Sequence, residues 1–438
     1  MADKDTTIDT IHGQIEIPQW LVKIKDEPVI HRMMRIKQLG LKAFIDFTNA
    51  NHTRYSHSLG TMFLASKLAD LMIKKENSRV TRRTRLKANL EYNKNSLMAA
   101  GFFHDVGHGP FSHVLDFVLE REIKRDHEWI ATEVVKRFSK ELEGDSIPIS
   151  QVNNIIAKGK DHYPYLRGII NGPLDVDKVD YLLRDSYNVG LRYSFDLNHF
   201  LDQIAILGEG DELEKFELGL TNSPQAIVST ELFLLLWKSM YTLVYLIQSS
   251  RIAEKMLEKA ILTAIRDGTS IQDDIKDLDK YIELDESVLL NKLKTSEGFP
   301  KEIYQRIFEK PDLYVAVFES DLNLFKTTPE FLKALHKSQD NVSDTISQQL
   351  SQLEPRKPYS IICDIISAKN PKEIYIDAKD EHGEPIEVKQ KSSVIRALTQ
   401  PEVILKIYLH PELVKTTRFV KDKGKSIKTE AQRIIEDW

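Results

Sequence analysis

Three histidines and an aspartate fall within the twelve residues FFHDVGHGPFSH, residues 102–113. The 438-residue chain has only 13 histidines. An imidazole directly followed by a carboxylate is unusual in a packed apolar core, where polar side chains need partners. The adjacent His104 and Asp105 therefore indicate a metal site or proton-transfer chemistry. A helix-end pair without a ligand is the alternative, because a single His-Asp dipeptide is common.

Two further segments could complete a metal site. NHTRYSHSLG places His57 at the head of a predicted amphipathic helix, and LDVDKVDYLLRD places Asp177 at the start of another. Imidazole and carboxylate ligands together suit a borderline or hard divalent ion, such as Fe, Mn, Zn or Mg. Ligands from three helix ends can enclose one ion and leave positions open for water and substrate. We therefore expect one divalent ion per chain, held by His57, His104, Asp105 and Asp177.

Three histidines in or near this motif are not among the predicted metal ligands: His108, His113 and His127. A helical core usually contains few buried histidines, so the group suggests phosphate contacts and proton transfer. His113 and Asp116 are three residues apart on a predicted helix and thus share a face. A carboxylate there can fix the tautomer of the imidazole and raise its pKa, as a general acid requires. The alternative is an ordinary His–Asp pair on a helix surface.

The segment DKVDYLLRD contains a stripe of functional side chains. Asp177, Tyr181 and Arg184 follow each other at i, i+4 and i+7 on one helical face, with Lys178 and Asp185 beside them. A metal ligand, an aromatic ring and cations on one stripe favour a nucleotide site. A salt-bridged surface helix is the alternative.

Composition excludes several classes of protein. With 41% hydrophobic and 29% charged residues and a formal charge of −5, the chain is typical of a soluble globular protein. No global basic field predicts binding to nucleic acid or to an anionic membrane. Cys363 is the only cysteine, so we expect no disulfide framework and a reducing, cytoplasmic location. The polar N-terminus MADKDTTIDT lacks the apolar region of a signal peptide.

The most apolar run, residues 232–247, is interrupted by Lys238. It is shorter than the roughly 20 residues of a membrane span, so we expect a buried helix and no membrane partner. Residues 74–94 contain a local basic cluster of Arg79, Arg82, Arg83 and Arg85. A solvated loop or helix face is favoured there over a polyphosphate or nucleic-acid contact.

Hydrophobic periodicity predicts a mainly α fold. From Ile15 to about Gly268 the apolar residues mostly recur at three- and four-residue intervals, and residues 269–345 are more charged but still mostly helical. Beyond Pro355 the pattern changes to strand-like segments, with DEHG (380–383) as a turn: YSIICDII, EIYIDA, EPIEVKQK and VILKIYL. We predict a helical domain over residues 1–350 and a small α/β lobe over residues 351–438.

Six blocks of this sequence resemble the HD-domain phosphohydrolases. More narrowly, they are similar to the deoxynucleoside triphosphate (dNTP) triphosphohydrolases related to the vertebrate SAM-and-HD-domain protein, and we expect no SAM domain before them. The blocks occur in the family's order and span residues 11–17, 35–40, 54–60, 101–113, 126–131 and 175–185. The resemblance implies an HD-domain helical core, a metal bound by the four residues named above, and usually an oligomer.

The resemblance also implies roles for individual residues. His113, paired with Asp116, would protonate the leaving sugar oxygen. Phosphates would be held by Arg54, His108, His127 and Lys178. The sugar and base would be bound by Gln38 and Asp185 at the 3′-hydroxyl and by Leu39, Tyr181 and Tyr245 through packing. Several members are activated by a guanine nucleotide at a second site, where Asp26 and Arg35 match and His31 replaces a glutamine.

Residues 237–248 depart from the family's pattern. Relatives carry an arginine eight residues before the tyrosine matched by Tyr245, and it helps to bind the terminal phosphate; here the residue is Trp237. Ile247 and Gln248 replace a His-Lys pair. These changes leave nucleotide monophosphates, diphosphates or another phosphoester open as substrates.

The leading hypothesis is a metal-dependent phosphohydrolase that converts dNTPs to the deoxynucleoside and inorganic triphosphate, with further Mg²⁺ accompanying the nucleotide. Two alternatives remain. One is an HD phosphatase or phosphodiesterase acting on another nucleotide. The other is a nucleotide-sensing regulatory protein with little turnover.

Overall fold

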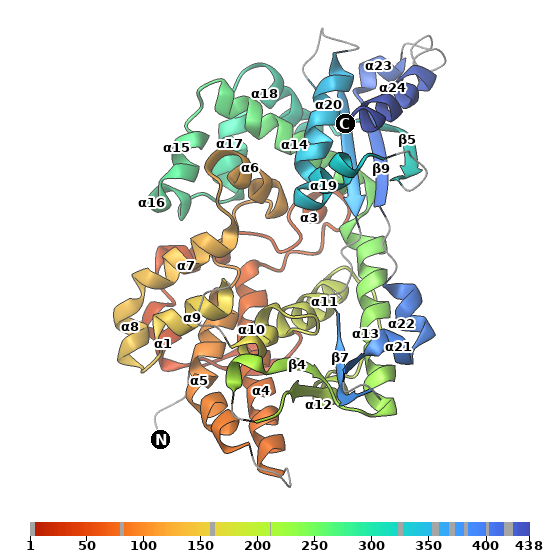
Figure 1. The fold of residues 1–438 in the computed structure, drawn as a ribbon. Helices are drawn as coiled ribbons and strands as arrows, with labels where there is room; N and C mark the ends of the chain where they lie inside the picture. Colours follow the sequence, from red (N-terminus) through yellow and green to blue (C-terminus); the bar gives the residue numbers. More distant parts are fainter. Residues whose placement is uncertain are drawn as a thin grey trace.

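The computed structural model describes residues 5–78, 83–157, 163–210, 212–322, 327–352, 359–367, 373–380, 384–399, 403–415 and 424–438. The described chain is mainly helical with small sheets (Figure 1), which confirms the predicted fold class. Arg79, Arg82 and residues 381–383 of the predicted DEHG turn lie outside the described residues.

The chain begins with an antiparallel hairpin, β1 (Thr6–Asp9) and β2 (Gly13–Glu16), whose turn ends at Gly13 with a φ of 74°. Three short helices follow: α1 (Gln19–Ile24), α2 (Pro28–Met33) and α3 (Lys42–Ile45). The long helices α4 (Arg54–Ser78) and α5 (Thr84–Phe103) then pack side by side (Figure 1).

The helices that follow α5 along the chain carry several of the motif residues. They are α6 (His113–Ile123), α7 (His127–Arg137), α8 (Ser139–Gly144), α9 (Ile149–Ile156), α10 (Pro164–Asn171) and α11 (Val176–Asn188). Both α10 and α11 pack on α4. Asp175 caps the N-terminus of α11 by accepting from the Lys178 amide at 2.7 Å, so Asp177 lies in the first turn.

A second group of helices follows a short hairpin. The helix α12 (Leu197–Gln203) leads into this hairpin. Its strands are β3 (Ile204–Leu207) and β4 (Glu217–Leu220), with the short helix η1 (Leu213–Lys215) between them. The helices are α13 (Pro224–Met240), the π-helical turn η2 (Tyr241–Tyr245), α14 (Gln248–Arg266), α15 (Ile271–Lys276), α16 (Leu278–Tyr281), α17 (Glu286–Thr295), α18 (Gly298–Tyr304) and the π-helical turn η3 (Gln305–Glu309).

A lobe with its own apolar core forms the C-terminal part. Its antiparallel sheet has the order β5 (Val315–Asp321), β9 (Val403–Leu409), β6 (Ile361–Ser367). Its helices are α19 (Pro329–Lys337), α20 (Gln339–Ser351), α23 (Pro411–Lys415) and α24 (Gly424–Glu436). Ile346 of α20, Ile435 of α24, and Ile365 and Ile407 of the sheet are all buried in this core.

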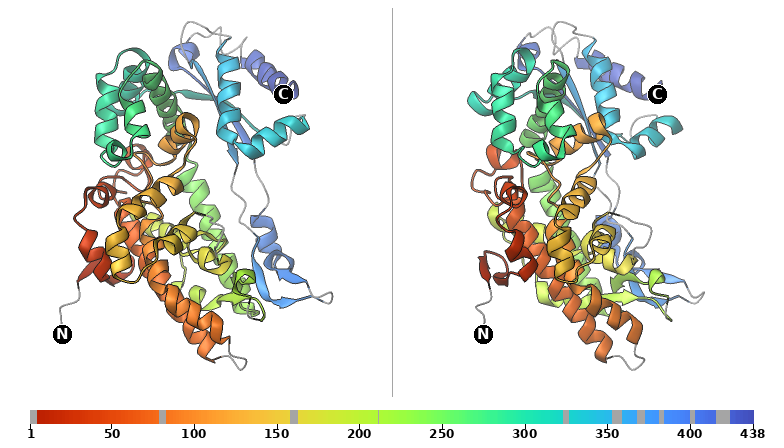
Figure 2. Two further views of the ribbon diagram at one scale, coloured as in Figure 1. Left: turned by 60° about the vertical axis from the view of Figure 1, so that its left-hand side comes forward. Right: turned by 90° about the vertical axis from the view of Figure 1, so that its left-hand side faces the viewer.

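The segment between β6 and β9 leaves the lobe. It contains β7 (Tyr375–Lys379), β8 (Pro385–Glu387), α21 (Val388–Lys391) and α22 (Ser393–Leu398). β7 pairs in parallel with β4, α22 packs on α13, and Figure 2 shows the segment beside the lower helices. The predicted strands are present, except that VKQK (388–391) is the helix α21. The domain boundary at 350 stays a prediction. In the structure β5 and α20 belong to the lobe although they precede residue 350, and residues 375–398 return to the helical part.

The apolar run at 232–247 ends α13 and continues into η2. Pro224–Tyr245 is long and apolar enough to cross a membrane by length and composition alone, and 44% of its most apolar window is buried in the fold. Val228, Leu232 and Leu235 are 53%, 45% and 51% exposed. The prediction of a buried helix therefore holds for one face only.

Arg83 of the basic cluster is structural, since it pairs with the buried Glu76 and donates to the Ile206 carbonyl at 3.0 Å.

Partly buried ion pairs join the lobe to helices α14 and α6 of the helical part. Lys255 of α14 lies 2.6 Å from Asp340 of α20 and 3.0 Å from both oxygens of Glu258. Asp344 of α20 pairs with Arg121 of α6. Burial raises the pKa of Glu258 from 4.5 to about 7, although Lys255 acts in the opposite direction.

The raised pKa of Glu258 predicts a pH-dependent stability. Between pH 4.5 and about 7 the folded chain keeps a proton on Glu258 that the unfolded chain loses. The contribution is therefore complete below pH 4.5 and is lost as the pH rises through about 7. Urea unfolding across this range should show a flatter profile for Glu258→Gln than for the wild type, whereas Glu283→Gln, on the surface, should follow the wild type. Parallel profiles for all three proteins would contradict this prediction.

Candidate metal centre and active site

Three helix ends bring the four predicted metal ligands together. His57 lies in the first turn of α4, His104 and Asp105 follow the last residue of α5, and Asp177 lies in the first turn of α11. His57 Nε2 is 3.0 Å from Asp177 Oδ1 and 3.6 Å from Asp105 Oδ2. His104 Nε2 is 3.4 Å from an oxygen of each of the same two carboxylates.

The donor set fits a divalent cation. Within the part of the chain that the structure describes, the buried Nε2 atoms of His57 and His104 make no hydrogen bond. Their Nδ1–H groups donate to Asp180 and to the Gly101 carbonyl, each at 2.8 Å, so Nε2 is the ring nitrogen that faces the carboxylates of the metal group. The ligand atoms of His57, His104 and Asp177 lie within 4.8 Å of one another.

The electrostatics of this group favour added positive charge. Burial lowers the pKa of His57, but Asp177 and Asp180 raise it to about 10. Burial raises the pKa of Asp177, but the two histidines hold it below its usual range. The carboxylates thus attract a cation into the space between the two imidazoles, and a divalent metal ion supplies that charge.

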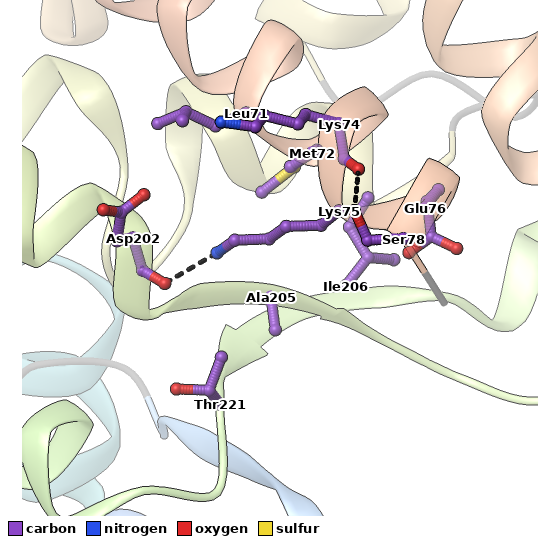
Figure 3. A pocket seen from close by; sticks show the side chains of 10 residues that line it. All are labelled: Leu71, Met72, Lys74, Lys75, Glu76, Ser78, Asp202, Ala205, Ile206 and Thr221. Atoms are coloured by element: carbon purple, nitrogen blue, oxygen red, sulfur yellow. Dashed lines mark hydrogen bonds between the residues drawn. The ribbon is translucent and has the colours of Figure 1, made fainter. Parts of the chain in front are cut away.

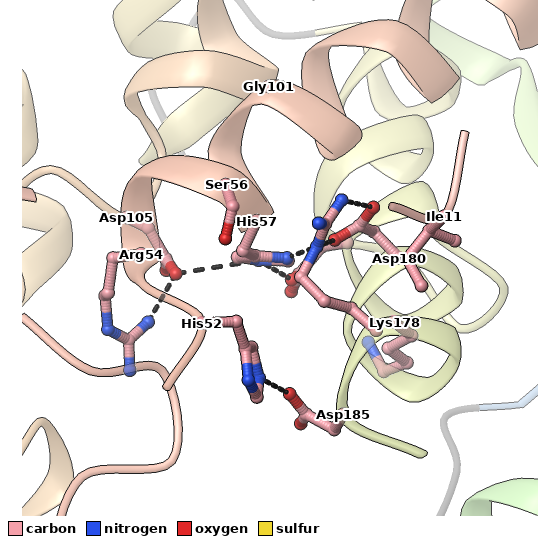
Figure 4. A network of polar contacts seen from close by, with 12 residues as sticks. Ile11, His52, Arg54, Ser56, His57, Gly101, Asp105, Lys178, Asp180 and Asp185 are labelled. Carbon is pink, nitrogen blue, oxygen red and sulfur yellow. Dashed lines mark hydrogen bonds and ion pairs between the residues drawn. The ribbon is translucent and has the colours of Figure 1, made fainter. Parts of the chain in front are cut away.

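Two predicted phosphate-binding cations lie near this group. Arg54 pairs with Asp105 (Figure 4), and its Nη2 donates to Ser112 Oγ at 2.7 Å. Lys178 Nζ donates to Asp175 at 2.5 Å and to the Gly172 carbonyl at 3.0 Å. Both side chains therefore already have polar partners within the fold.

A second cluster gathers around Asp116. His108 Nδ1 is 3.1 Å, His127 Nδ1 3.4 Å and His113 Nδ1 3.7 Å from Asp116 Oδ2. The rings of His108 and His127 stack with centroids 3.8 Å apart. The His113 side chain is 77% exposed, so the predicted His113–Asp116 pair is the loosest of the three. His108 Nε2 also lies 3.4 Å from Asp105 Oδ1, which places the second cluster directly beside the first.

These imidazoles have different environments. Burial and the nearby Arg54 lower the pKa of His108. Burial also acts to lower the pKa of His127, but Asp116 raises it overall. The geometry of His108, Asp116 and His127 is itself compact enough for a metal ion, since their ligand atoms lie within 4.8 Å of one another.

The predicted sugar-binding residues surround Asp185. Tyr245 Oη donates to Asp185 Oδ2 at 2.7 Å, and His52 Nε2 lies 2.6 Å from Oδ1. The backbone N–H of Gln38 donates to the His52 carbonyl at 3.1 Å, and the buried Gln38 Oε1 has no hydrogen-bond partner among the described residues. Tyr181 contacts Tyr245 edge to face with centroids 5.9 Å apart. Leu39, beside Gln38 in the chain, is buried.

Aromatic rings occupy the position where relatives are expected to have a cation. Trp237 is buried and packs on Tyr241 with centroids 4.3 Å apart, and Tyr241 packs on Tyr245 at 5.1 Å. Ile247 precedes α14, and Gln248 is its first residue.

The residues matched to the activating nucleotide lie at the surface. Asp26 is 3.8 Å from His31 Nε2, and the Asp26 side chain is 85% exposed. Arg35 Nε donates to Asp285 at 2.6 Å, and about half of the Arg35 side chain is exposed. These two residues therefore have separate partners.

Several residues that support the site were not predicted. Asp180, His12 and Asp9 stand behind His57, and His52 stands behind Asp185. One signal was available for Asp180, which lies one turn after Asp177 and four residues before Arg184. No local pattern singled out His12 or His52, because their partners lie 168 and 133 residues away.

A surface hollow of about 450 Å³ lies elsewhere, between the end of α4 and β3 (Figure 3). Lys75 in its wall donates to the carbonyls of Asp202 and Ile204, each at 2.7 Å. Lys75 is about 27 Å along α4 from His57 by helix geometry. The hollow is therefore separate from the metal centre.

Two family models match the chain. A model described as the HD domain matches residues 54–185, and one described as the HD associated region matches residues 213–431, half of the chain. The chain belongs to the HD-domain family. The HD domain match contains His57, His104, Asp105 and Asp177, and the HD associated region contains Tyr245 and most of the lobe.

Three relatives show more narrowly which proteins this HD-domain chain is similar to. It is 31% identical over 299 residues to an uncharacterized protein, MJ1154, of Methanocaldococcus jannaschii, covering 68% of this chain and 57% of the relative. It is 26% identical over 362 residues to the Dictyostelium discoideum homolog of deoxynucleoside triphosphate triphosphohydrolase SAMHD1 (78% and 63%). It is 33% identical over 228 residues to SAMHD1 of Bos taurus (44% and 37%).

The resemblance drawn from the six blocks is thus confirmed at the level of the family. This HD-domain chain spans less than two thirds of the length of each of these relatives. The roles assigned to individual site residues stay predictions.

Proposed function

We propose that this chain is a metal-dependent phosphohydrolase that hydrolyses dNTPs to the deoxynucleoside and inorganic triphosphate. The observation that carries the proposal is the pair of buried, unpartnered imidazole nitrogens of His57 and His104 facing two carboxylates, beside the histidines around Asp116. Relatives named as deoxynucleoside triphosphate triphosphohydrolases support the substrate class.

His57, His104, Asp105 and Asp177 would hold the divalent ion, which when bound supplies Lewis acidity and lowers the pKa of a bound water. Arg54 supplies a buried planar cation beside Asp105, suited to an α-phosphate oxygen. His108 lies between Asp105 and Asp116 and links the metal-binding carboxylate to the second cluster.

Proton donation to the leaving 5′-oxygen is assigned to His113. Its exposed imidazole can approach a substrate, and Asp116 can stabilise the imidazolium and orient the ring. The acid then lies on the sugar side of the phosphorus, so the deoxynucleoside departs and the triphosphate remains intact.

The sugar filter is assigned to the residues around Asp185. His52 and Tyr245 fix this carboxylate from opposite oxygens. No described residue donates to the buried Gln38 Oε1, and a sugar hydroxyl can supply that donor. Leu39, Tyr181 and Tyr245 would pack on the sugar and base.

One observation favours a second candidate, an HD phosphatase or phosphodiesterase acting on a nucleotide with fewer phosphates. Trp237 and Tyr241 present aromatic rings where a terminal phosphate would need a cation. Lys178, another cation that the resemblance assigns to the phosphates, already donates to Asp175 and to the Gly172 carbonyl.

Product analysis tests the proposal. Metal-loaded protein should convert dGTP and dATP to deoxynucleoside and triphosphate, separated by chromatography, and leave ATP largely uncleaved. Formation of dNMP and pyrophosphate would contradict the placement of His113. Cleavage of monophosphates alone would favour the second candidate, equal cleavage of ATP and dATP would remove the sugar filter, and full metal content without turnover would indicate a regulatory protein.

We also propose a cytoplasmic homo-oligomer whose nucleotide is accompanied by further Mg²⁺ and whose activity responds to a guanine nucleotide at Asp26 and Arg35. The solvent exposure of these two residues supports this second site. The same assay with and without added GTP, together with light scattering, provides the comparison.

A further inference from the structure

Behind the metal ligand His57 lies a fully buried carboxylate. Asp180 has no exposed surface, and its Oδ2 accepts from His57 Nδ1 at 2.8 Å. Its other donors are His12 Nε2 at 2.6 Å and Arg184 through Nε and Nη2 at 2.8 and 3.0 Å. A carboxylate has about four lone-pair sites, so these four donors satisfy it completely.

His12 comes from the N-terminal hairpin. It stands in the turn between β1 and β2, yet its side chain is only 1% exposed and packs on Phe63 of α4 with ring centroids 5.2 Å apart. A second tie holds the same turn, because Asp9 accepts from the amides of Ile11 and His12 at 2.9 Å and from Arg184 at 2.7 Å. The hairpin is thus attached to α11 through two side chains that both reach the Asp180–Arg184 pair.

Gly60 makes this arrangement possible. A Cβ at position 60 would lie 1.9 Å from Asp180 Oδ1 and 2.4 Å from Arg184 Nη2. Any side chain there would therefore displace the carboxylate that contacts His57, one turn earlier on α4. The backbone of α4 and the Asp180–Arg184 pair thus fit together only with glycine at this position.

We propose that the N-terminal hairpin, residues 5–17, is the outer part of the metal centre, and that Asp180 and His12 are positioning residues for His57. Asp180 fixes the Nδ1–H tautomer and the ring plane of His57, and His12 fixes Asp180. Metal affinity therefore depends on the docking of the hairpin. This inference rests on the metal site of the proposed function but not on its substrate.

The physical reason is the cost of an unsatisfied charge in a dry site. Without His12, one lone pair of Asp180 loses its donor where no solvent reaches, and the carboxylate turns to compensate. His57 then loses the partner that aims Nε2 at the metal position. Loss of such a supporting carboxylate or its partner typically weakens metal binding by about 10- to 100-fold.

The test measures Co²⁺ affinity of the full chain by competition with a chelator, with the visible spectrum of bound Co²⁺ reporting on the ligand set. His12→Leu should weaken Co²⁺ binding by about 10- to 100-fold and alter the spectrum. His12→Gln, which keeps a donor, should restore most of the affinity. Asp9→Ala loosens the hairpin without touching Asp180 and should give a smaller loss. His199→Leu, an exposed histidine on α12, should match the wild type.

Thermal unfolding of the metal-free proteins separates positioning from folding. Weaker Co²⁺ binding at an unchanged melting temperature supports the proposal. Wild-type affinity in His12→Leu overturns it, and so does His12→Gln with restored stability but not affinity. Because the assay contains no nucleotide, a wild type that binds Co²⁺ but hydrolyses nothing would remove the proposed function alone. A wild type that binds no Co²⁺ would overturn both.

Discussion

Replacing His104 with alanine should leave the purified protein without its metal ion and without turnover. The Nε2 atom of His104 faces Asp105 and Asp177 and has no other partner in the described ranges, while its Nδ1 is fixed by the Gly101 carbonyl. Supporting residues behind a ligand are worth about 10- to 100-fold in affinity, so loss of the ligand itself should exceed roughly 100-fold. Elemental analysis after gel filtration measures the metal content per chain.

Two matched variants make this result specific. Asp105→Ala should behave like His104→Ala, because it removes the carboxylate that lies between the metal group and Arg54. His199→Ala removes an exposed imidazole and should keep the wild-type metal content. Unchanged metal in both site variants would show that the ion is bound elsewhere or not at all.

Replacing His113 with alanine should preserve the metal and the fold but reduce kcat by about 10²- to 10⁴-fold, the usual cost of removing a general acid. The side chain is 77% exposed, so truncation leaves no cavity in the core. Its Nδ1 is 3.7 Å from Asp116, close enough to be drawn into a hydrogen bond when a substrate is bound. Turnover, metal content and melting temperature should be measured on the same preparation.

His127→Ala provides the comparison for His113→Ala. The His127 ring stacks on His108, and its Nδ1 is nearer to Asp116 than the Nδ1 of His113 is. We therefore expect His127 to contact the phosphate rather than to protonate the leaving oxygen. A wild-type kcat in His113→Ala combined with a large loss in His127→Ala would transfer the acid role to His127. Asp116→Asn should impair turnover in either case, because all three imidazoles adjoin this carboxylate.

Chemistry that is encoded locally could be predicted from the sequence. His104 and Asp105 are adjacent, and His113 and Asp116 are one helical turn apart, so their proximity required no knowledge of the fold. His12 and His52 contact Asp180 and Asp185 across 168 and 133 residues. Such contacts depend on how the hairpin and the α3–α4 connection dock, and no periodic pattern encodes that docking.

The fold shows the same division. Helical periodicity was sufficient to predict the mainly α class, and four strands near the C-terminus were recognised from alternation and branched residues. The return of residues 375–398 to the helical part could not be predicted, because it requires β7 to pair with β4 rather than with β6 or β9. Which strands pair is a property of the whole chain and not of the strand itself.

Helix α6 gives the lobe a mechanical connection to catalysis. His113 is its first residue, and Arg121, paired with Asp344 of the lobe, lies about 12 Å further along the helix by its rise per residue. Helix α6 thus carries the assigned acid at its first residue and is held near its other end by the lobe. An effector whose binding free energy differs between two placements of the lobe would therefore bias the orientation of His113. By the same coupling free energy, substrate bound at His113 would alter the affinity for that effector.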